Sequence, residues 1–335
     1  MKALHAHLGF AMVVAMTLSA TGQTTGTTSS QPLPATDGSG APSATPAVQI
    51  LKNFRESDVK FDVDRLMSLL RDRNHEGWVL AAYPDPKTGQ PLIGAGVSMD
   101  LPAREHPQSD PLNPNPFLEA ASADLWQAAG LEPARLDRIL DEFHQNLATW
   151  GDMHEYRRHI GDLPPQITEQ EAAQFLRIAI VQSVLNARAY CRNFDHLTPS
   201  QQMAVSQLVF QMGTNLAEFT QFLDLINSDA TAAPMAKKVA ARDVQYWNGV
   251  QRSLIQSQWA RLYRLRAISV IAMLDPRYNQ NPRMAERRVG AVLRPPVIHR
   301  HRRRSAGATQ LASNGKSAGR HPGKATGRSK RKASA

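Results

Sequence analysis

The sequence has 335 residues, of which 42% are hydrophobic and 20% are charged, as is usual for a soluble globular protein and unlike a protein with several membrane spans. Its single cysteine, Cys191, excludes an intramolecular disulfide framework and a cysteine-rich zinc module. The net charge of +10 is unevenly distributed. From Arg283 to the end there are 15 lysines and arginines and one acidic residue, a net charge of +14, whereas residues 23–282 hold 23 basic and 28 acidic residues. The body of the chain is therefore mildly acidic, and the basic charge lies in the C-terminal segment.

Residues 1–22 have the pattern of a signal peptide. Lys2 precedes an apolar run of 11 residues from Leu8 to Leu18, and Ala20-Thr21-Gly22 offers small residues for cleavage. A transmembrane helix needs about 20 apolar residues, so the run is too short to span a bilayer. We therefore expect a secreted, periplasmic or cell-envelope protein, with an uncleaved N-terminal anchor as the alternative.

Two further segments lack the apolar residues that a packed core requires. Residues 23–48 are mostly Thr, Ser, Gly, Pro and Ala, which predicts a disordered linker. Residues 283–335 are predicted to form a basic disordered tail, because no apolar periodicity runs through the segment from about 295 onward. Such a tail attracts polyanions, so we expect it to bind anionic cell-envelope polymers, with no specific nucleic acid as partner. A tail that only aids solubility is the alternative.

The remaining residues, 50–282, are predicted to form one mainly helical domain of the α+β class. Asp62 is a candidate N-cap before an apolar pattern at Val63, Leu66, Met67 and Leu70. Thr168 and Thr198 each begin a capping box ahead of a longer helix. Further helices are expected at about 136–147, 219–226 and 254–273, and turn residues between two short apolar stretches predict a small β-hairpin between Trp78 and Gly96.

Motifs for cofactors and metals are missing from the sequence. It contains no Gly-rich phosphate loop, no Gly-x-Ser-x-Gly elbow and no histidine pair at i, i+4 spacing. We therefore expect no cofactor and no metal. Cys191 lies near the end of an amphipathic helix, and a packed role is expected for it. Asp100–Pro116 is rich in Pro and Asp and predicts an irregular surface loop.

Two carboxylic acids, Glu76 and Asp85, flank the predicted hairpin. Glu76 is followed by Trp78, Val79 and Leu80, and a carboxyl group beside such an apolar wall keeps its proton to higher pH. Asp85 lies in a polar turn, where a carboxylate stays ionised. Glycosidic cleavage requires this division between a proton donor and an ionised partner. An unrelated Glu and Asp in a solvated turn is the alternative that the spacing alone leaves open.

The residues around this pair resemble the active-site hairpin of phage-type lysozymes (muramidases). In that family a Glu-Gly is followed by Tyr-x-Asp, a Gly turn and Thr-Ile-Gly-x-Gly. The matching residues here are Glu76-Gly77, Tyr83-Pro84-Asp85, Gly89 and Leu92-Ile93-Gly94-Ala95-Gly96.

A second block of similarity follows in the order found in the family. Residues 167–172 are similar to the start of its long interdomain helix. Residues 208–213, with Phe219, are similar to its C-terminal motif, and residues 246–248 to the aromatic segment after it. The similarity covers about 60–96 and 166–273, and the intervening 97–165 is predicted to be an enlarged insertion.

The resemblance implies a lysozyme-like two-lobe fold, with a β-hairpin lobe and a helical lobe around a glycan cleft. It implies a monomeric glycoside hydrolase of the muramidase type, which cleaves the β-1,4 bond between N-acetylmuramic acid and N-acetylglucosamine in peptidoglycan. Glu76 would be the general acid and Asp85 the partner that positions water. Gly96 and Gln211 would line the sugar subsites.

Two residues depart from the family pattern. The hydroxyl residue that helps to hold the attacking water is Leu92 here, and the His after Gly-x-Gly is Val97. Ser98 is a candidate replacement for one of them. The departures leave the acid in place, so a hydrolase is expected. The alternatives are a non-catalytic cell-wall-binding protein with the same cleft and, from the tail alone, a nucleic-acid-binding protein.

Overall fold

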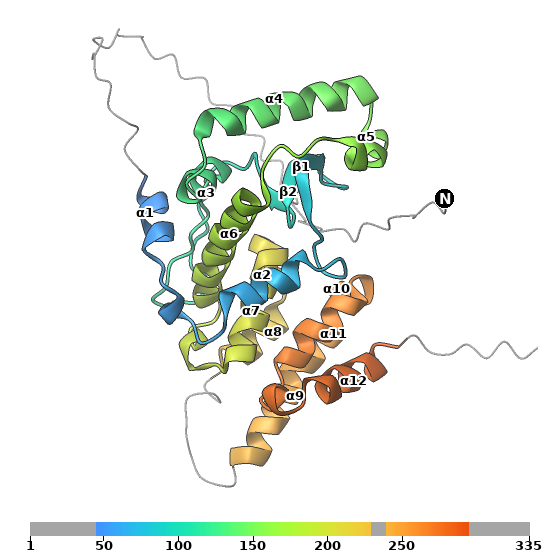
Figure 1. Ribbon diagram of the computed structural model, residues 1–335. Coiled ribbons are helices and arrows are strands. Elements are labelled where there is room, and N and C mark those ends of the chain that lie inside the picture. The colour runs from blue at the N-terminus through green and yellow to red at the C-terminus, as the bar shows by residue number, and fades with distance from the viewer. Residues whose placement is uncertain (1–44, 229–238, 295–335) are drawn as a thin grey trace, which may run out of the picture. The chain divides into compact units, whose positions relative to one another are not determined.

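The computed structural model describes residues 45–228 and 239–294, without the side chains of 239–244 (Figure 1). The predicted signal peptide, most of the predicted linker and the basic segment from 295 onward lie outside these residues. The described part is mainly helical and contains one small antiparallel sheet, in agreement with the predicted fold class. Within the described residues, no helix combines the length and the apolar character needed to cross a membrane.

The helices occur in three groups along the chain. Before the sheet lie α1 (Pro46–Asn53) and α2 (Val63–Arg71), and between the sheet and residue 165 lie α3 (Ser122–Ala128), α4 (Pro133–Trp150) and α5 (Met153–His159). The remaining α-helices are α6 (Glu169–Tyr190), α7 (Pro199–Met212), α8 (Thr220–Ile226), α9 (Val239–Ile255), α10 (Gln258–Leu262), α11 (Arg264–Met273) and α12 (Pro282–Val292).

The predicted hairpin is confirmed, and a third strand extends it. β1 (Val79–Pro84), β2 (Pro91–Gly94) and β3 (Val97–Ser98) form an antiparallel sheet in the order β1-β2-β3. In this register Leu92 pairs with Tyr83 on one side and with Ser98 on the other. Directly opposed residues project from the same face of a sheet, so Leu92 and Ser98 are cross-strand neighbours.

All three predicted N-caps are confirmed. The Asp62 side chain accepts hydrogen bonds from the backbone N–H groups of residues 64 and 65 at the start of α2. Thr168 and Thr198 each form a complete capping box, at α6 and α7 respectively. These caps satisfy backbone donors that a helix leaves unpaired at its first turn, which is why the local sequence locates the helix starts well.

The prediction of one continuous helix over 254–273 was wrong. α9 ends at Ile255, and Ser257 then adopts an extended conformation in which its side chain accepts a hydrogen bond from Ala260 N at 3.1 Å, which begins α10. Tyr263, with φ −113° and ψ 48°, separates α10 from α11. Leu262, which lies within the predicted helix, is 60% exposed.

The predicted boundaries of the linker and of the tail also require correction. Residues 46–48, assigned to the linker, form the first turn of α1, where Thr45 is the N-cap and Val48 is buried. Residues 283–292, assigned to the disordered tail, belong to α12, which Asn281 caps and which packs on α11. Ala285 and Val289 of α12 are buried. They lie four residues apart and so share one face of the helix, an apolar pattern that is hard to recognise in so highly charged a segment.

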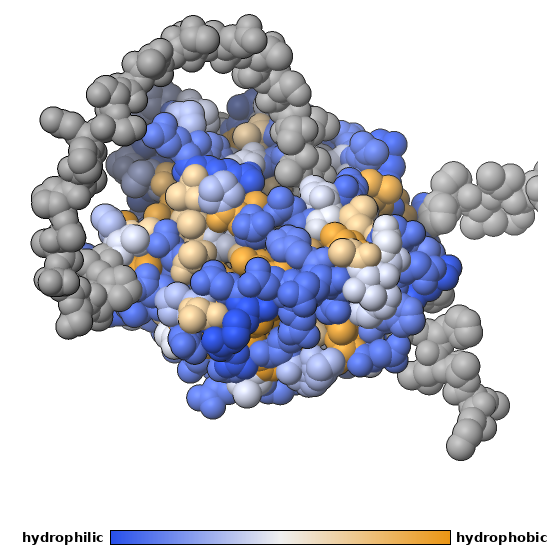
Figure 2. Space-filling model, turned by 90° about the horizontal axis from the view of Figure 1, so that it is seen from above, coloured by the Kyte–Doolittle hydropathy of each residue, from blue (hydrophilic) through white to orange (hydrophobic). Residues whose placement is uncertain are grey.

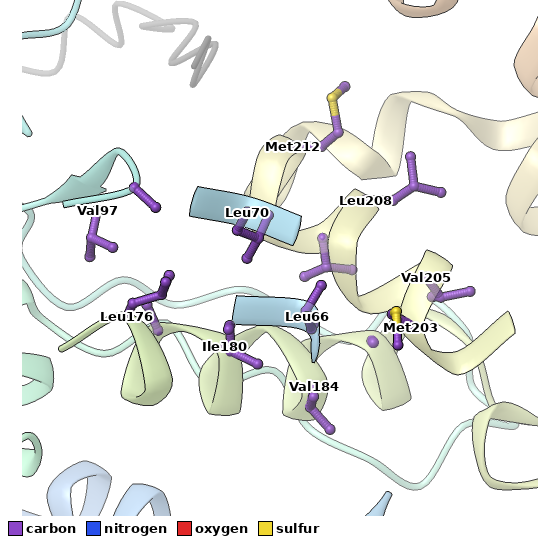
Figure 3. Packing of buried hydrophobic residues seen from close by; sticks show 14 of the residues in the cluster. Leu66, Leu70, Val97, Leu176, Ile180, Val184, Met203, Val205, Leu208 and Met212 are labelled. Carbon is purple, nitrogen blue, oxygen red and sulfur yellow. The ribbon is translucent and has the colours of Figure 1, made fainter. Parts of the chain in front are cut away.

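The core is organised around α6. Figure 3 shows Leu66 and Leu70 of α2 between the apolar side chains of α6 and those of α7. α6 also contacts β2 and β3, while α7 contacts α11. Because α6 contacts the sheet and also α2 and α7, it is the element that relates the hairpin to the rest of the described chain.

The 97–165 insertion packs on the hairpin. Its first part is irregular, as predicted for 100–116, apart from a single β-bridge between Arg104 and Glu119. α4 and α5 both contact β1, and the Tyr156 hydroxyl donates a hydrogen bond to the Ala82 carbonyl at 3.0 Å. Figure 2 shows one face of the molecule, on which hydrophilic residues predominate and apolar residues form separate small patches.

Candidate active site

Asp85 is held in the β1–β2 turn by its own backbone neighbourhood. Its Oδ1 accepts hydrogen bonds from Lys87 N at 2.9 Å, Thr88 N at 2.8 Å and Thr88 Oγ1 at 3.0 Å. Gly89, with φ +73°, closes the turn by donating its N–H to the Asp85 carbonyl. Three donors therefore fix one carboxylate oxygen, which leaves the other available.

That second oxygen, Asp85 Oδ2, is buried and has no hydrogen-bond partner among the described residues. The whole residue is only 1% exposed. Asp85 lines a cavity of about 520 Å³, a size within the range of small-molecule sites. An unpaired buried acceptor costs roughly 1–3 kcal/mol unless water or a ligand satisfies it. Asp85 therefore brings to the lining of the cavity a carboxyl group with one oxygen that has no partner among the described residues.

Glu76 lies just beyond α2, where its N–H bonds to the Leu70 carbonyl. Its carboxylate forms an ion pair with Arg266 of α11, with 2.8 Å between Arg266 Nη1 and Glu76 Oε1. The two side chains are 3% and 1% exposed, respectively. The two atoms are close without the alignment of a hydrogen bond, and both oxygens of Glu76 lack a hydrogen-bond partner.

Opposing effects act on the proton affinity of Glu76. Burial raises the pKa of the carboxyl group, and the Arg266 guanidinium opposes that effect; burial is the larger effect, so the pKa lies above its ordinary value. Arg266 also donates from Nη2 to the carbonyl of His75. Burial and the same guanidinium together lower the pKa of His75 to about 4, which leaves His75 neutral near pH 7.

The structure brings the two predicted carboxylates into one neighbourhood. Both act electrostatically on the buried phenol of Tyr83, whose pKa is raised first by burial and then by their charges, and both act in the same way on Tyr263. They differ, however, in access. Asp85 lines the cavity, whereas Glu76 is sealed against Arg266 and is not among the lining residues.

The two predicted sugar-binding residues also differ in whether they line the cavity. Gly96, with φ +81°, lines the cavity. Gln211 does not line the cavity, although its sequence neighbours Phe210 and Met212 do. Instead, Gln211 Oε1 accepts a hydrogen bond from Trp259 Nε1 at 3.0 Å. Gln211 therefore ties α7 to α10 in this structure.

The departures from the lysozyme pattern lie next to the cavity. Leu92 and Val97 line it as apolar residues. Ser98 lines it too, and its Oγ is buried without a hydrogen-bond partner among the described residues. Since Ser98 is the cross-strand partner of Leu92, a hydroxyl is present one strand away from the position where the family carries one.

Sequence patterns did not indicate three polar groups near this site. Arg266 lies 190 residues from Glu76 in an apolar helix, and no local pattern connects the two. Arg157 of α5 interacts electrostatically with Asp85 and Tyr83. Glu119 comes from the irregular part of the insertion and lines the cavity. Each is brought in by tertiary packing, although the pattern Arg264-Leu265-Arg266 did place two charges in an apolar stretch.

No protein-family model matches this chain, and no curated protein matches it significantly in sequence.

Proposed function

We propose that this protein is an exported peptidoglycan hydrolase that cleaves the glycan strand between N-acetylmuramic acid and N-acetylglucosamine, and that its fold is the lysozyme-like two-lobe fold. The observation that carries the proposal is the contrast between two neighbouring carboxyl groups. Asp85 lines a ligand-sized cavity and has one buried oxygen without a hydrogen-bond partner among the described residues, and burial raises the pKa of Glu76. Glycoside hydrolysis uses two carboxyl groups in different surroundings, one as the proton donor and the other as its partner.

In the proposed reaction, the Glu76 carboxyl transfers its proton to the glycosidic oxygen while the bond from that oxygen to the anomeric carbon breaks. Asp85 stabilises the positive charge that develops on the sugar ring. A water molecule positioned by Asp85 adds its oxygen to the anomeric carbon and gives its proton to the Asp85 carboxylate, and proton exchange with solvent then restores both carboxyl groups. Because Glu76 does not line the cavity, the proposal requires its side chain to turn away from Arg266 when the glycan binds.

A water-binding residue is also needed. Leu92 lacks a hydrogen-bonding group, and the unpaired hydroxyl of Ser98 on the adjacent strand supports a role for Ser98 in its place. Asp85 and Ser98 line the same cavity, and Asp85 Oδ2 and Ser98 Oγ are both buried without a hydrogen-bond partner among the described residues, so a water molecule that reached either atom would relieve a desolvation cost.

The second candidate function is a non-catalytic cell-wall-binding protein. It is favoured by the sealed ion pair of Glu76 with Arg266, which withholds the acid from the cavity, and by the apolar residue at position 92. In either case we propose a monomer outside the cytoplasm, with residues 295–335 binding anionic envelope polymers. The basis for this part is the sequence alone: the signal pattern and the charge of the C-terminal segment.

Release of reducing ends from purified peptidoglycan tests the proposal. Glu76→Gln keeps the shape of the side chain and removes the transferable proton, so hydrolysis should fall by about 10²–10⁴-fold while glycan binding persists. Asp137→Asn, an exposed acid on α4, is the matched control and should leave the rate unchanged. If wild type and Glu76→Gln are equally inactive on every wall but both bind it, the wall-binding function replaces the enzyme.

A further inference from the structure

Glu119 is a second carboxyl group in the cavity that Asp85 lines, and it comes from the insertion. Its side chain is 17% exposed, and Asn186 Nδ2 of α6 donates a hydrogen bond to its Oε1 at 2.8 Å. His106 Nδ1 lies 4.0 Å from the same oxygen, but burial lowers the pKa of His106, so this ring does not supply a full positive charge near neutral pH. The carboxyl group is thus held in place by Asn186, and the cation that acts on it is Arg104, which also lines the cavity; burial outweighs both and raises the pKa of Glu119.

The backbone that carries Glu119 is clamped on both sides. Asn186 Oδ1 accepts a hydrogen bond from Leu118 N at 2.7 Å, and Asn186 Nδ2 donates to the Leu118 carbonyl at 3.1 Å. Gln182 Oε1 accepts from Ala120 N at 3.2 Å. Gln182 and Asn186 are four residues apart on one helix and therefore project from the same face. Two side-chain amides of α6 thus fix the residues before and after Glu119.

This arrangement is that of a preorganised polar group in a ligand site. A small number of fixed polar side chains normally sets the orientation of a ligand in a largely apolar cavity. Sugars offer hydroxyl groups, and N-acetylated sugars also an amide N–H, as hydrogen-bond donors to a carboxylate. Asp85, Ser98 and Glu119 line one cavity, so a bound sugar that reaches Asp85 has a further acceptor in the same cavity.

We propose that Glu119 is a substrate-binding residue, added to the cavity by the 97–165 insertion, whose carboxylate accepts hydrogen bonds from the hydroxyl or acetamido N–H groups of a sugar bound next to Asp85. The inference rests on the proposed function in one respect, that the cavity takes a glycan. It does not depend on cleavage, and it holds equally for a catalytic and for a non-catalytic cavity.

The test is calorimetric binding of an uncharged tetramer of N-acetylglucosamine to the full-length protein. Because a hydrogen bond to a charged group is lost, Glu119→Ala should weaken binding by about 10-fold or more. Glu119→Gln keeps one acceptor for Asn186 and should lose less affinity than Glu119→Ala. Glu105→Gln is the matched control, since Glu105 is an exposed acid of the same loop that does not line the cavity. Near-UV circular dichroism confirms that each variant keeps the native fold.

Hydrolysis of peptidoglycan by the same variants separates the possible outcomes. The proposal expects KM to rise by about 10-fold or more with kcat nearly unchanged, as for a residue that binds ground state and transition state equally. Unchanged binding by Glu119→Ala in a hydrolytically active protein would overturn the role of Glu119 and leave the hydrolase standing. Glycan binding that depends on Glu119, in a protein that does not hydrolyse peptidoglycan, would overturn the hydrolase and leave the role of Glu119 standing. A fall in kcat of about 100-fold at constant KM would overturn the binding role in favour of proton transfer, and a wild type that binds no glycan would overturn both proposals.

Discussion

Arg266 lies 2.8 Å from the carboxylate of Glu76, and both side chains are almost completely buried. The pair joins the segment after α2 to α11, and Arg266 adds a hydrogen bond to the carbonyl of His75. Removing both charges from such a pair is often neutral, but removing one partner is strongly destabilising because it leaves a buried charge uncompensated. The pair therefore constrains both the stability of the fold and the chemistry available to Glu76.

Arg266→Gln should destabilise the protein by about 3–5 kcal/mol at pH 7. Without the guanidinium, the pKa of Glu76 rises further above its ordinary value of 4.5. When the pKa of a carboxyl group is higher in the folded than in the unfolded protein, folding stability falls as the pH rises above the unfolded pKa. The destabilisation caused by Arg266→Gln should therefore be smaller near pH 4 than at pH 7. Urea unfolding at both pH values measures this. Arg277→Gln, at an exposed arginine, is the control, and an equal loss at the two pH values would contradict the prediction.

His75 should make the protein less stable in mild acid. Its pKa is lowered from 6.5 to about 4 by burial and by Arg266. Between these values the unfolded chain binds a proton that the folded protein does not, so stability is fully present above pH 6.5 and declines as the pH falls toward 4. The decline amounts to about 3 kcal/mol at 1.36 kcal/mol per pH unit. In urea unfolding from pH 7 to pH 4, His75→Gln should have a flatter pH dependence; an unchanged slope would exclude His75 as its source.

Ser98 and Leu92 can be tested as a pair. If Ser98 holds the attacking water, Ser98→Ala should lower peptidoglycan hydrolysis by about 10-fold or more, because the water loses one of its hydrogen bonds. Leu92→Thr should restore part of that loss in the double variant, since it returns a hydroxyl to the adjacent strand. Initial rates for the four proteins of this cycle give the coupling. Additive effects would show that the two positions do not serve one water molecule.

Truncation should distinguish α12 from the residues beyond it. A chain ending at Arg294 keeps α12 and should unfold at the wild-type urea concentration, while its binding to anionic wall at low salt should weaken and depend less on salt. A chain ending at Asn281 also loses the buried Ala285 and Val289 and should be less stable by at least about 2 kcal/mol. Equal stability of the two truncated chains would show that α12 contributes nothing to the fold.

The sequence predicted the elements that depend on local interactions. Asp62, Thr168 and Thr198 cap helices through hydrogen bonds that span two or three residues, and the Tyr83–Gly89 turn is closed by bonds of similar range. The break between α9 and α11 was missed because apolar spacing continues through it, although Ser257 carries a capping signal. Most of α12 was assigned to the tail because its many charged residues outweigh the two buried apolar residues, Ala285 and Val289, in the sequence pattern.

The candidate site was only partly predictable for the same physical reason. Glu76, Asp85 and Gly96 belong to one continuous hairpin segment, so a short motif contains them. Arg266 and Glu119 reach the site through tertiary packing, from α11 and from an insertion whose irregular backbone has no periodicity. The orientation of Gln211 toward Trp259, and not into the cavity, depends on where α10 begins.

The clamp formed by Gln182 and Asn186 has a consequence for the thermodynamics of binding. α6 contacts β2 and β3 and also holds the segment around Glu119, so one helix supports two walls of the cavity. The conformational entropy of ordering those walls is therefore lost when the chain folds and not when a ligand arrives. Shortening either amide, as in Gln182→Ala, would transfer that loss to the binding step, and its signature would be a more unfavourable binding entropy.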